Sequence, residues 1–153
     1  MEYRIESQPS FSVLEVDLAP GEQIVTEAGA MAWMSDNLTV TTGARGGVMG
    51  GLKRAVLTAE SFFQNTYEAE SGPGTIGIAP GQAGNIIAYE LQDQELILEK
   101  NAYLASTTDV HTDASFEGFR GLFNEGLFAL TVSGTGTVFF SGYGDVEEVE
   151  VDG

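Results

Sequence analysis

The sequence predicts an all-β fold, a β-sandwich made of two tandem pseudo-repeats. Three features of the 153 residues support this fold class. Short runs of alternating hydrophobic and polar residues are separated by turn residues at intervals of about 8–12 positions, which is typical of sandwiches and barrels. The 20 glycines suit a turn-rich β protein better than a helical one. A block of sequence in the first half also returns in the second half.

The expected strands follow from this alternation and from the turns between the runs. Residues 13–18 alternate strictly, and Pro20 and Gly21 then favour a turn, because proline suits an early turn position and glycine a later one. Helix is scarce, with a turn or two at most in residues 52–58 and 119–125. Further strands are expected at residues 1–5, 23–28, around 38–40, 63–69, 75–79, 86–91, 95–99, 127–133, 137–141 and 146–151.

The strongest internal pattern is a repeat. Residues 22–31 match residues 94–103 at an offset of 72 positions, so that Gly29 of the first copy lies over Asn101 of the second. Glycine and asparagine are the residues that best tolerate a positive φ. We therefore expect a sharp bend at this place in both halves.

Further along the chain the offset becomes smaller. Residues 72–76 match residues 134–138 at an offset of 62, so the second copy has shorter loops. We expect a single domain over residues 1–153, with internal repeats over approximately 1–80 and 81–153.

The charge balance is strongly acidic. Asp and Glu total 23 against six Lys and Arg, which gives a net charge of −17. Nucleic-acid binding depends on neutralising phosphates, so we expect no nucleic-acid partner. The charge favours solubility through self-repulsion or, more specifically, a halophilic source, because high salt screens the repulsion between carboxylates.

Location and redox chemistry follow from what the sequence lacks. No stretch approaches the roughly 20 apolar residues of a membrane-spanning helix, and no apolar run follows the first residues as in a secretion signal. There is no cysteine, and therefore neither a disulfide nor a thiolate metal site. We expect a cytoplasmic protein without a membrane span.

Several motifs resemble those of the family named for altered inheritance of mitochondria. They lie at residues 1–5, 20–22, 27–31, 50–54, 60–66, 102–107, 125–128 and 133–139 and so cover nearly the whole chain. The resemblance implies a fold similar to the tryptophan-RNA-binding attenuation protein, a double-stranded β-helix type of architecture in which small β-sandwich units repeat within one chain. Members typically carry three units, and residues 149–153 lie where a third would begin. The resemblance also implies an interaction role, since eukaryotic members resemble mitochondrial organising factors.

The most suggestive segment for ligand binding is the glycine-rich, basic run of residues 43–54. It holds Arg45, Lys53 and Arg54, half of all basic residues, so its backbone N–H groups and cations are candidates for binding an anion. It is not a P-loop, because Lys53 does not directly follow Gly51. A flexible connection between sheets, or a contact with a partner, is the interpretation that we favour.

A second glycine pattern, at residues 72–77, spells the dinucleotide fingerprint. That fingerprint works only between a strand and a helix, whose N-terminus receives the pyrophosphate. Pro80 argues against a helix here, and we expect a β-hairpin turn instead.

The sequence contains no catalytic constellation. His111 is the only histidine, and we expect it at the surface, since one histidine cannot supply a metal site and no Gly-x-Ser-x-Gly motif occurs. Glu27 and Glu99 occupy equivalent repeat positions. Glycoside hydrolysis needs two carboxyls about 5–9.5 Å apart across a cleft, and equivalent positions need not face each other. We expect solvated strand-end acids, and no catalytic residue, metal or cofactor.

The large apolar residues indicate assembly. Adjacent phenylalanines on a strand point to opposite faces, so the pairs at positions 62/63 and 139/140 imply a second layer or another subunit on both faces. Met31, Trp33 and Met34 are assigned to the core or to an interface. We therefore expect a non-enzymatic, oligomeric scaffold or interaction protein. The alternative is a small-ligand or anion-binding module that uses the loop 43–54.

Overall fold

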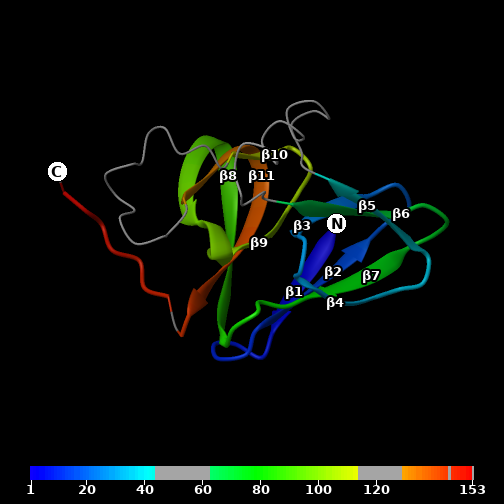
Figure 1. The fold of residues 1–153 in the computed structure, drawn as a ribbon, viewed down its shortest axis with the longest axis horizontal. Coiled ribbons are helices and arrows are strands. Elements are labelled where there is room, and N and C mark those ends of the chain that lie inside the picture. Colours follow the sequence, from blue (N-terminus) through cyan, green and yellow to red (C-terminus); the bar gives the residue numbers. More distant parts are fainter. Residues whose placement is uncertain (44–62, 114–128, 145, 153) are drawn as a thin grey trace.

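The computed structural model describes residues 1–43, 63–113, 129–144 and 146–152, and over these residues the protein is an all-β sandwich (Figure 1). The predicted fold class is confirmed. The first half contains β1 (Glu2–Glu6), β2 (Val13–Leu18), β3 (Gln23–Glu27), β4 (Met31–Met34), β5 (Leu38–Gly43), β6 (Gln64–Ala69) and β7 (Gly74–Ile78). The second half contains β8 (Gly84–Glu99), the 3₁₀ turn η1 (Lys100–Ala102), β9 (Tyr103–Ser106), β10 (Val110–Asp113) and β11 (Ala129–Tyr143).

The strands form two sheets with antiparallel pairing throughout. The smaller sheet has the order β1-β2-β7-β4. The larger sheet has the order β10-β11-β9-β3-β6-β5, and β8 pairs with β11. In Figure 1 the first half lies on the right and the long strands β8 and β11 run beside each other on the left. The pair β3 and β9 joins the two halves within the larger sheet.

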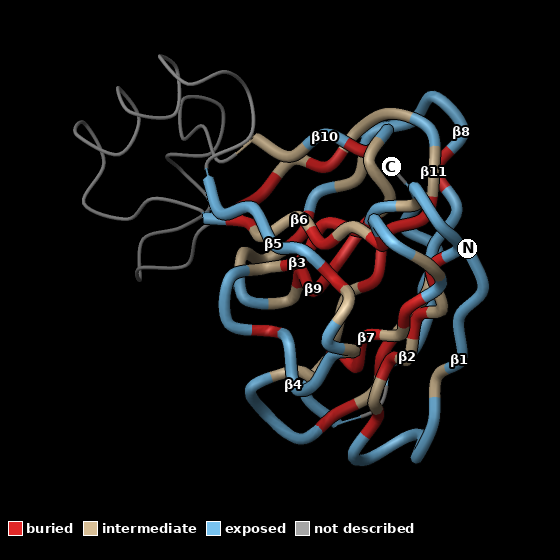
Figure 2. Tube along the Cα trace, turned by 90° about the vertical axis from the view of Figure 1, so that its right-hand side faces the viewer, coloured by how far each residue is buried: buried red, intermediate tan, exposed pale blue. Residues whose placement is uncertain are grey.

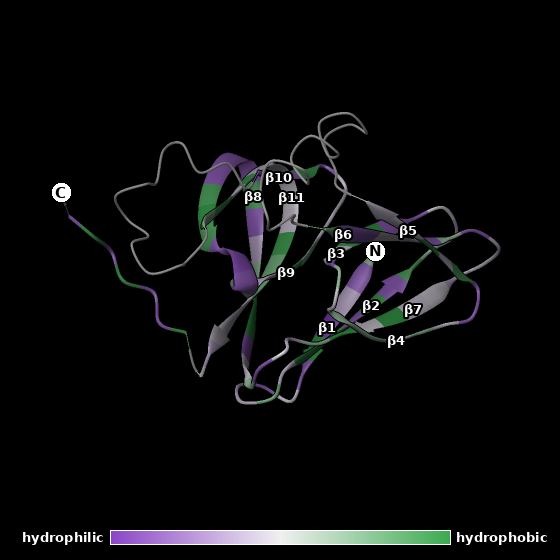
Figure 3. Cartoon of the chain, viewed as in Figure 1, coloured by the Kyte–Doolittle hydropathy of each residue, from purple (hydrophilic) through white to green (hydrophobic). Residues whose placement is uncertain are grey.

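Alternation of residue types explains why these segments pack as strands. Along β2 the exposure alternates strictly, with Leu14, Val16 and Leu18 buried and the residues between them half-buried. Figure 3 shows hydrophobic and hydrophilic segments alternating along β2 and β8, and Figure 2 shows the buried residues gathered between the sheets. One buried cluster fills the first half and includes Ile86, Leu104, Ala105 and Phe139 from the second half. A second cluster lies wholly within the second half.

The two halves pair their strands in the same way. In the first half, β3 and β5 flank β6, while β2 and β4 flank β7. In the second half, residues 95–99 of β8 and β10 flank the start of β11, while residues 84–91 of β8 and β9 flank its end. Strand β3 is therefore equivalent to residues 95–99 of β8, β4 to β9, and β5 to β10. The two strands β6 and β7 together are equivalent to β11.

Each half has a glycine with positive φ at the same repeat position. Gly72 has a φ of +133° and Gly134 a φ of +114°, and the two positions are equivalent at the offset of 62. The expectation of a hairpin at residues 72–77 was wrong, because β6 and β7 belong to different sheets and do not pair with each other. The turn carries the chain from one sheet to the other, and strand β7 follows it where a nucleotide-binding fingerprint would need a helix.

The bends after β3 and β8 occur where the repeat predicted them, but by another mechanism. Neither Gly29 nor Asn101 adopts a positive φ. The carboxylate of Glu27 accepts the N–H of Gly29 at 3.0 Å, and the carboxylate of Glu99 accepts the N–H of Asn101 at 3.2 Å. A side-chain acceptor two residues earlier therefore holds each turn, as in Asx-type turns.

Three expectations for the elements require correction or lie outside the described residues. The runs 86–91 and 95–99 belong to one strand, β8, and the described parts of 127–133 and 137–141 belong to β11. The strand expected at 146–151 is not formed: residues 146–152 belong to no strand of the described structure, and Val151 is 90% exposed. The short helices considered at 52–58 and 119–125 lie outside the described residues.

Only some of the large apolar residues assigned to the core or to an interface lie in the core. Phe139 is fully buried, as expected. In contrast, Met31, Trp33 and Met34 in β4 are 37%, 43% and 37% exposed, because β4 is the edge strand of the smaller sheet. Phe63 is also exposed, and Phe62 lies outside the described residues.

Candidate functional site

The structure describes only part of what the sequence singled out for ligand binding. Arg45, Lys53 and Arg54 all lie outside the described residues, and of the loop 43–54 only Gly43 is described, at the end of β5. His111 is exposed on β10, as predicted.

The most informative place in the described structure is the junction between the two halves. There β3 pairs with β9 antiparallel, with Val25 opposite Ser106 and Thr26 opposite Ala105. All four residues are fully buried. This chain thus joins two of its own β units by pairing one strand of each, and the paired residues are completely buried. We call this β3–β9 contact the internal seam.

A buried polar network crosses the same junction. The side-chain N–H of Gln64 on β6 donates to the hydroxyl oxygen of Tyr103 at 3.0 Å, and that hydroxyl is hydrogen-bonded to Ser106 Oγ at 2.8 Å. Thr112 Oγ1 on β10 donates to Gln64 Oε1 at 3.2 Å. The network satisfies side chains that are almost completely buried, which burial would otherwise penalise.

Reasoning from the sequence missed this network. Gln64, Tyr103 and Ser106 fall within the motifs at residues 60–66 and 102–107, whereas Thr112 lies outside them. A glutamine in a strand of otherwise alternating pattern was the signal that could have indicated a buried polar partner.

A pocket of about 730 Å³ lies beside the junction. Its walls come from the two equivalent bends, one running from Glu27 to Ala30 and the other from Glu99 to Leu104. Further lining residues are also equivalent, since Ala79 and Gly81 of the first half correspond to Ser141 and Tyr143 of the second at the offset of 62. The two repeats therefore contribute matching positions to one cavity.

The chemistry of this pocket is set by the two carboxylates and by Lys100. Glu27 and Glu99 both line it, so the equivalent acids do share one cavity, although the sequence argument expected no such relation. Both are half-buried and each accepts a hydrogen bond within its own bend. Within the described ranges, no group of three or more His, Cys, Asp or Glu residues is placed to hold a metal ion.

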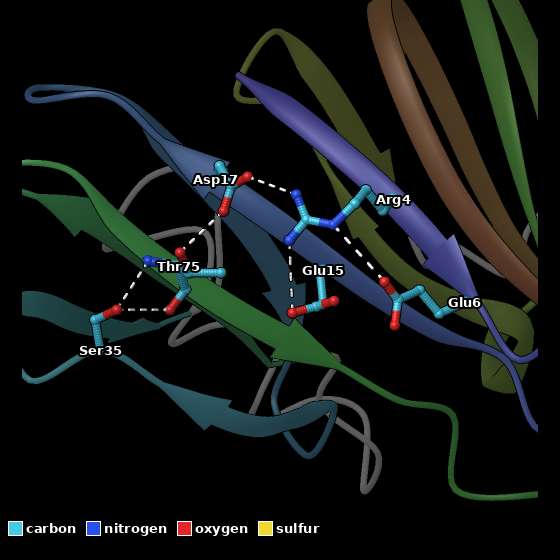
Figure 4. Close-up of polar contacts among 6 residues, drawn as sticks. All are labelled: Arg4, Glu6, Glu15, Asp17, Ser35 and Thr75. Atoms are coloured by element: carbon cyan, nitrogen blue, oxygen red, sulfur yellow. Dashed lines mark hydrogen bonds and ion pairs between the residues drawn. The ribbon is translucent and has the colours of Figure 1, made fainter.

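Two strand edges repeat the chemistry of the junction but have no partner strand among the described residues. They belong to β4, which is equivalent to β9, and to residues 95–99 of β8, which are equivalent to β3. Ser35, directly after β4, fixes the end of that strand on β7, because its backbone N–H donates to the carbonyl of Thr75 at 2.9 Å. Its hydroxyl also accepts the N–H of Thr75 at 2.9 Å (Figure 4). The edge of β4 is thus an ordered part of the sheet.

The outer face of the smaller sheet carries an ion cluster centred on Arg4 (Figure 4). Its guanidinium donates to Asp17 at 2.7 Å and lies 3.6 Å from Glu15 and 3.8 Å from Glu6. Thr75 donates to the other carboxylate oxygen of Asp17 at 2.9 Å. The hydrogen bond from Arg4 and then that from Thr75 lower the pKa of Asp17. The cluster ties β1, β2 and β7 together.

Fold and junction together define a β-sandwich protein in which two similar units are joined by strand pairing. The family model described as Mitochondrial biogenesis AIM24 matches residues 3–153. The chain therefore belongs to this family, which confirms the resemblance carried by the motifs.

Two relatives from Streptococcus pyogenes are similar over the whole chain. An uncharacterised protein of the serotype M6 strain is 27% identical over 162 residues, covering 100% of this chain and 65% of the relative. The crystal structure of a protein from the same species is similar with a TM-score of 0.79 and 27% identity, over 99% of this chain and 69% of that one. The chain thus spans about two thirds of the length of the curated relative it matches. Over the described residues, no helix is long and apolar enough to cross a membrane.

Proposed function

We propose that this protein is a non-enzymatic scaffold or interaction protein that works by self-association. The observation that carries the proposal is the edge strand β4. Its residues Met31, Trp33 and Met34 are each more than a third exposed and form an apolar edge that pairs with no strand among the described residues. Such an edge favours pairing with another chain unless it is covered.

The two acids of the pocket support the non-enzymatic part of the proposal. Glu27 and Glu99 each serve a structural purpose, because they hold equivalent turns through the N–H of the residue two positions later. A substrate panel for hydrolase and transferase activity tests this part, with Glu27→Gln and Glu99→Gln as controls. Turnover of any substrate that is lost in either variant would contradict it.

Self-association is tested by multi-angle light scattering over a range of protein concentrations in molar KCl. We expect a discrete oligomer in this high-salt buffer. A monomer at every concentration would overturn the proposal.

The anion-binding alternative rests on Arg45, Lys53 and Arg54 and stays a prediction. Inorganic phosphate is the probe: it should raise the melting temperature, and the pair Lys53→Ala and Arg54→Ala should abolish the rise. The net charge of −17 opposes a nucleic-acid partner. A cytoplasmic location belongs to the same proposal, and cell fractionation tests it.

A further inference from the structure

Taking self-association as proposed above, the strand pairing within the chain points to the surfaces that carry it. We propose that a second copy of this chain adds the open edge of its β4 to the open edge of residues 95–99 in β8. The two strands run antiparallel, with Met34 opposite Ile97 and Trp33 opposite Leu98. The contact reproduces, between copies, the β3–β9 pairing that joins the two halves of one copy.

The equivalence of the strands rests on their registers. In β4, Met31 lies opposite Ile78 and Met34 opposite Ile76. The equivalent residues of β9, 72 positions later, are Tyr103 and Ser106. They lie opposite Phe140 and Val138, which are 62 positions after Ile78 and Ile76. An irregularity in the register separates the two pairs in both halves. Strand β4 is therefore the first-half version of β9.

The same holds for β3 and residues 95–99, except that the residues opposite them are 65 positions apart in the two halves. Glu27 lies opposite Gln64, and Glu99 lies opposite Ala129. The internal seam places Val25 opposite Ser106 and Thr26 opposite Ala105. Adding 72 to the β3 positions and subtracting 72 from the β9 positions gives Ile97 opposite Met34 and Leu98 opposite Trp33.

Exposure supports this assignment with a comparison inside one molecule. At the internal seam Val25, Ala105 and Ser106 are fully buried. Their equivalents Ile97, Trp33 and Met34 are 50%, 43% and 37% exposed. Three of the four equivalents are thus apolar and exposed where no partner strand is described, whereas the fourth, Leu98, which corresponds to Thr26, is buried within its own half at 8% exposure.

The charge of the two edges fits a copy-to-copy contact. Neither residues 31–34 nor residues 96–98 include a charged residue, although the chain carries a net charge of −17. Natural edge strands usually carry charges that prevent pairing; β4 lacks them, and the edge of residues 95–99 carries them only at its two ends, as Glu95 and Glu99. The contact is heterologous, since each copy offers one edge of each kind, and it closes into a ring if the rotation between copies allows it.

The first experiment uses cysteine pairs, because the chain has no cysteine of its own. Met34→Cys and Ile97→Cys are prepared separately, mixed and oxidised mildly in molar KCl. Residues opposite each other in an antiparallel pair have Cα atoms about 4.5–5.5 Å apart, within the range that a disulfide spans. We expect a mixed disulfide dimer.

The control for cross-linking is Glu2→Cys mixed with Ile97→Cys. Glu2 is exposed on β1, the opposite edge strand of the same sheet, and should give no cross-link. A cross-link from Glu2→Cys in place of Met34→Cys would overturn the proposal and indicate the other edge.

The second experiment places a lysine on the proposed edge. Ile97→Lys should convert the oligomer to a monomer, with the melting temperature of the monomer close to that of other exposed variants. Val40→Lys is the matched control, because Val40 is 49% exposed on β5, an edge strand of the larger sheet. It should leave the oligomer intact.

The outcomes separate this inference from the proposed function. An oligomer that resists Ile97→Lys and gives no 34–97 cross-link overturns the inference but leaves self-association standing. A wild-type monomer overturns both. An oligomer that Val40→Lys disrupts and Ile97→Lys does not would show that another edge carries the contact, for example because a different segment covers β8.

Discussion

At the scale of single residues, the hydroxyl of Tyr103 has the largest structural consequence. It lies between Gln64 and Ser106, all three side chains are buried, and no apolar substitution can replace its hydrogen bonds. The network also links β6 of the first half to β9 of the second. One oxygen atom therefore takes part in fixing how the two halves sit together.

Tyr103→Phe should lower the free energy of unfolding by about 1–3 kcal/mol, because the amide of Gln64 loses its acceptor in a buried place. Urea unfolding measures the change. Tyr143→Phe is the matched control, since Tyr143 is 85% exposed, and its effect should stay within about 0.5 kcal/mol. Equal stability of Tyr103→Phe and the wild type would show that the network is dispensable.

Asp17 predicts a dependence on acid. Hydrogen bonds from Arg4 and Thr75 lower its pKa in the folded state, so the folded protein binds this proton less readily than the unfolded chain. The stabilisation is therefore fully present above the unfolded pKa of about 3.9, and it is lost as the pH falls through the folded pKa. In urea unfolding from pH 7 to pH 3, Asp17→Asn should be less stable than the wild type at neutral pH, and the difference should shrink on acidification.

Arg4→Met provides the control for this dependence. It removes the cation that contributes most to the lowered pKa of Asp17, so its stability should converge with the wild type over the same pH window. The double variant should show little further loss. Two additive losses that do not change with pH would contradict the coupling.

At the scale of elements, β4 and β7 show what the sequence could predict and what it could not. Alternation and the turns between the runs predicted β2, β3, β6 and β7 closely, although successive residues of β3 and β7 are buried on both faces and only β2 alternates strictly. It could not distinguish a core strand from an edge strand, because Met31, Trp33 and Met34 would suit either position. Only the order of strands in the sheet decides this, and that order depends on contacts between distant segments.

The long strands β8 and β11 were divided in the prediction for a related reason. Asp93 has a φ of +51°, and the register of β11 shifts between Gly134 and Thr135, so the alternation of residue types is interrupted in both strands at matching places. Pairing continues across this bulge, which local sequence does not reveal. The pocket escaped prediction as well, since its walls meet only when both halves are folded.

The pairing of β4 with β7 can be tested at Gly77. Its position lies directly beneath the indole of Trp33, so that a Cβ would overlap the ring. Gly77→Ala should displace Trp33 and destabilise the protein by about 1–3 kcal/mol. Trp33 is the only tryptophan, so its fluorescence emission should shift to longer wavelength as the ring enters water.

Gly81→Ala is the control for this prediction. A Cβ there would meet nothing within 4 Å, and both stability and emission should remain unchanged. An unchanged emission spectrum in Gly77→Ala would show that the indole has room to adjust where it lies.

At the scale of the whole molecule, the net charge of −17 predicts stabilisation by salt. Mutual repulsion of carboxylates opposes the compact state, and at 1 M salt the Debye length falls to about 3 Å. The melting temperature should therefore rise between dilute buffer and molar KCl. The same titration near pH 4, where many carboxylates are protonated, should give a smaller rise. A melting temperature that falls with KCl would contradict adaptation to high salt.

The pocket between the two bends has a consequence for how its chemistry can change. Its walls hold equivalent positions, yet the first has Ala28 and Gly29 where the second has Lys100 and Asn101. In a symmetric dimer one mutation alters both walls at once. Here each wall is encoded separately, so a mutation can change the residues of one wall and leave the other wall unchanged. The two sides of the cavity can therefore become chemically different.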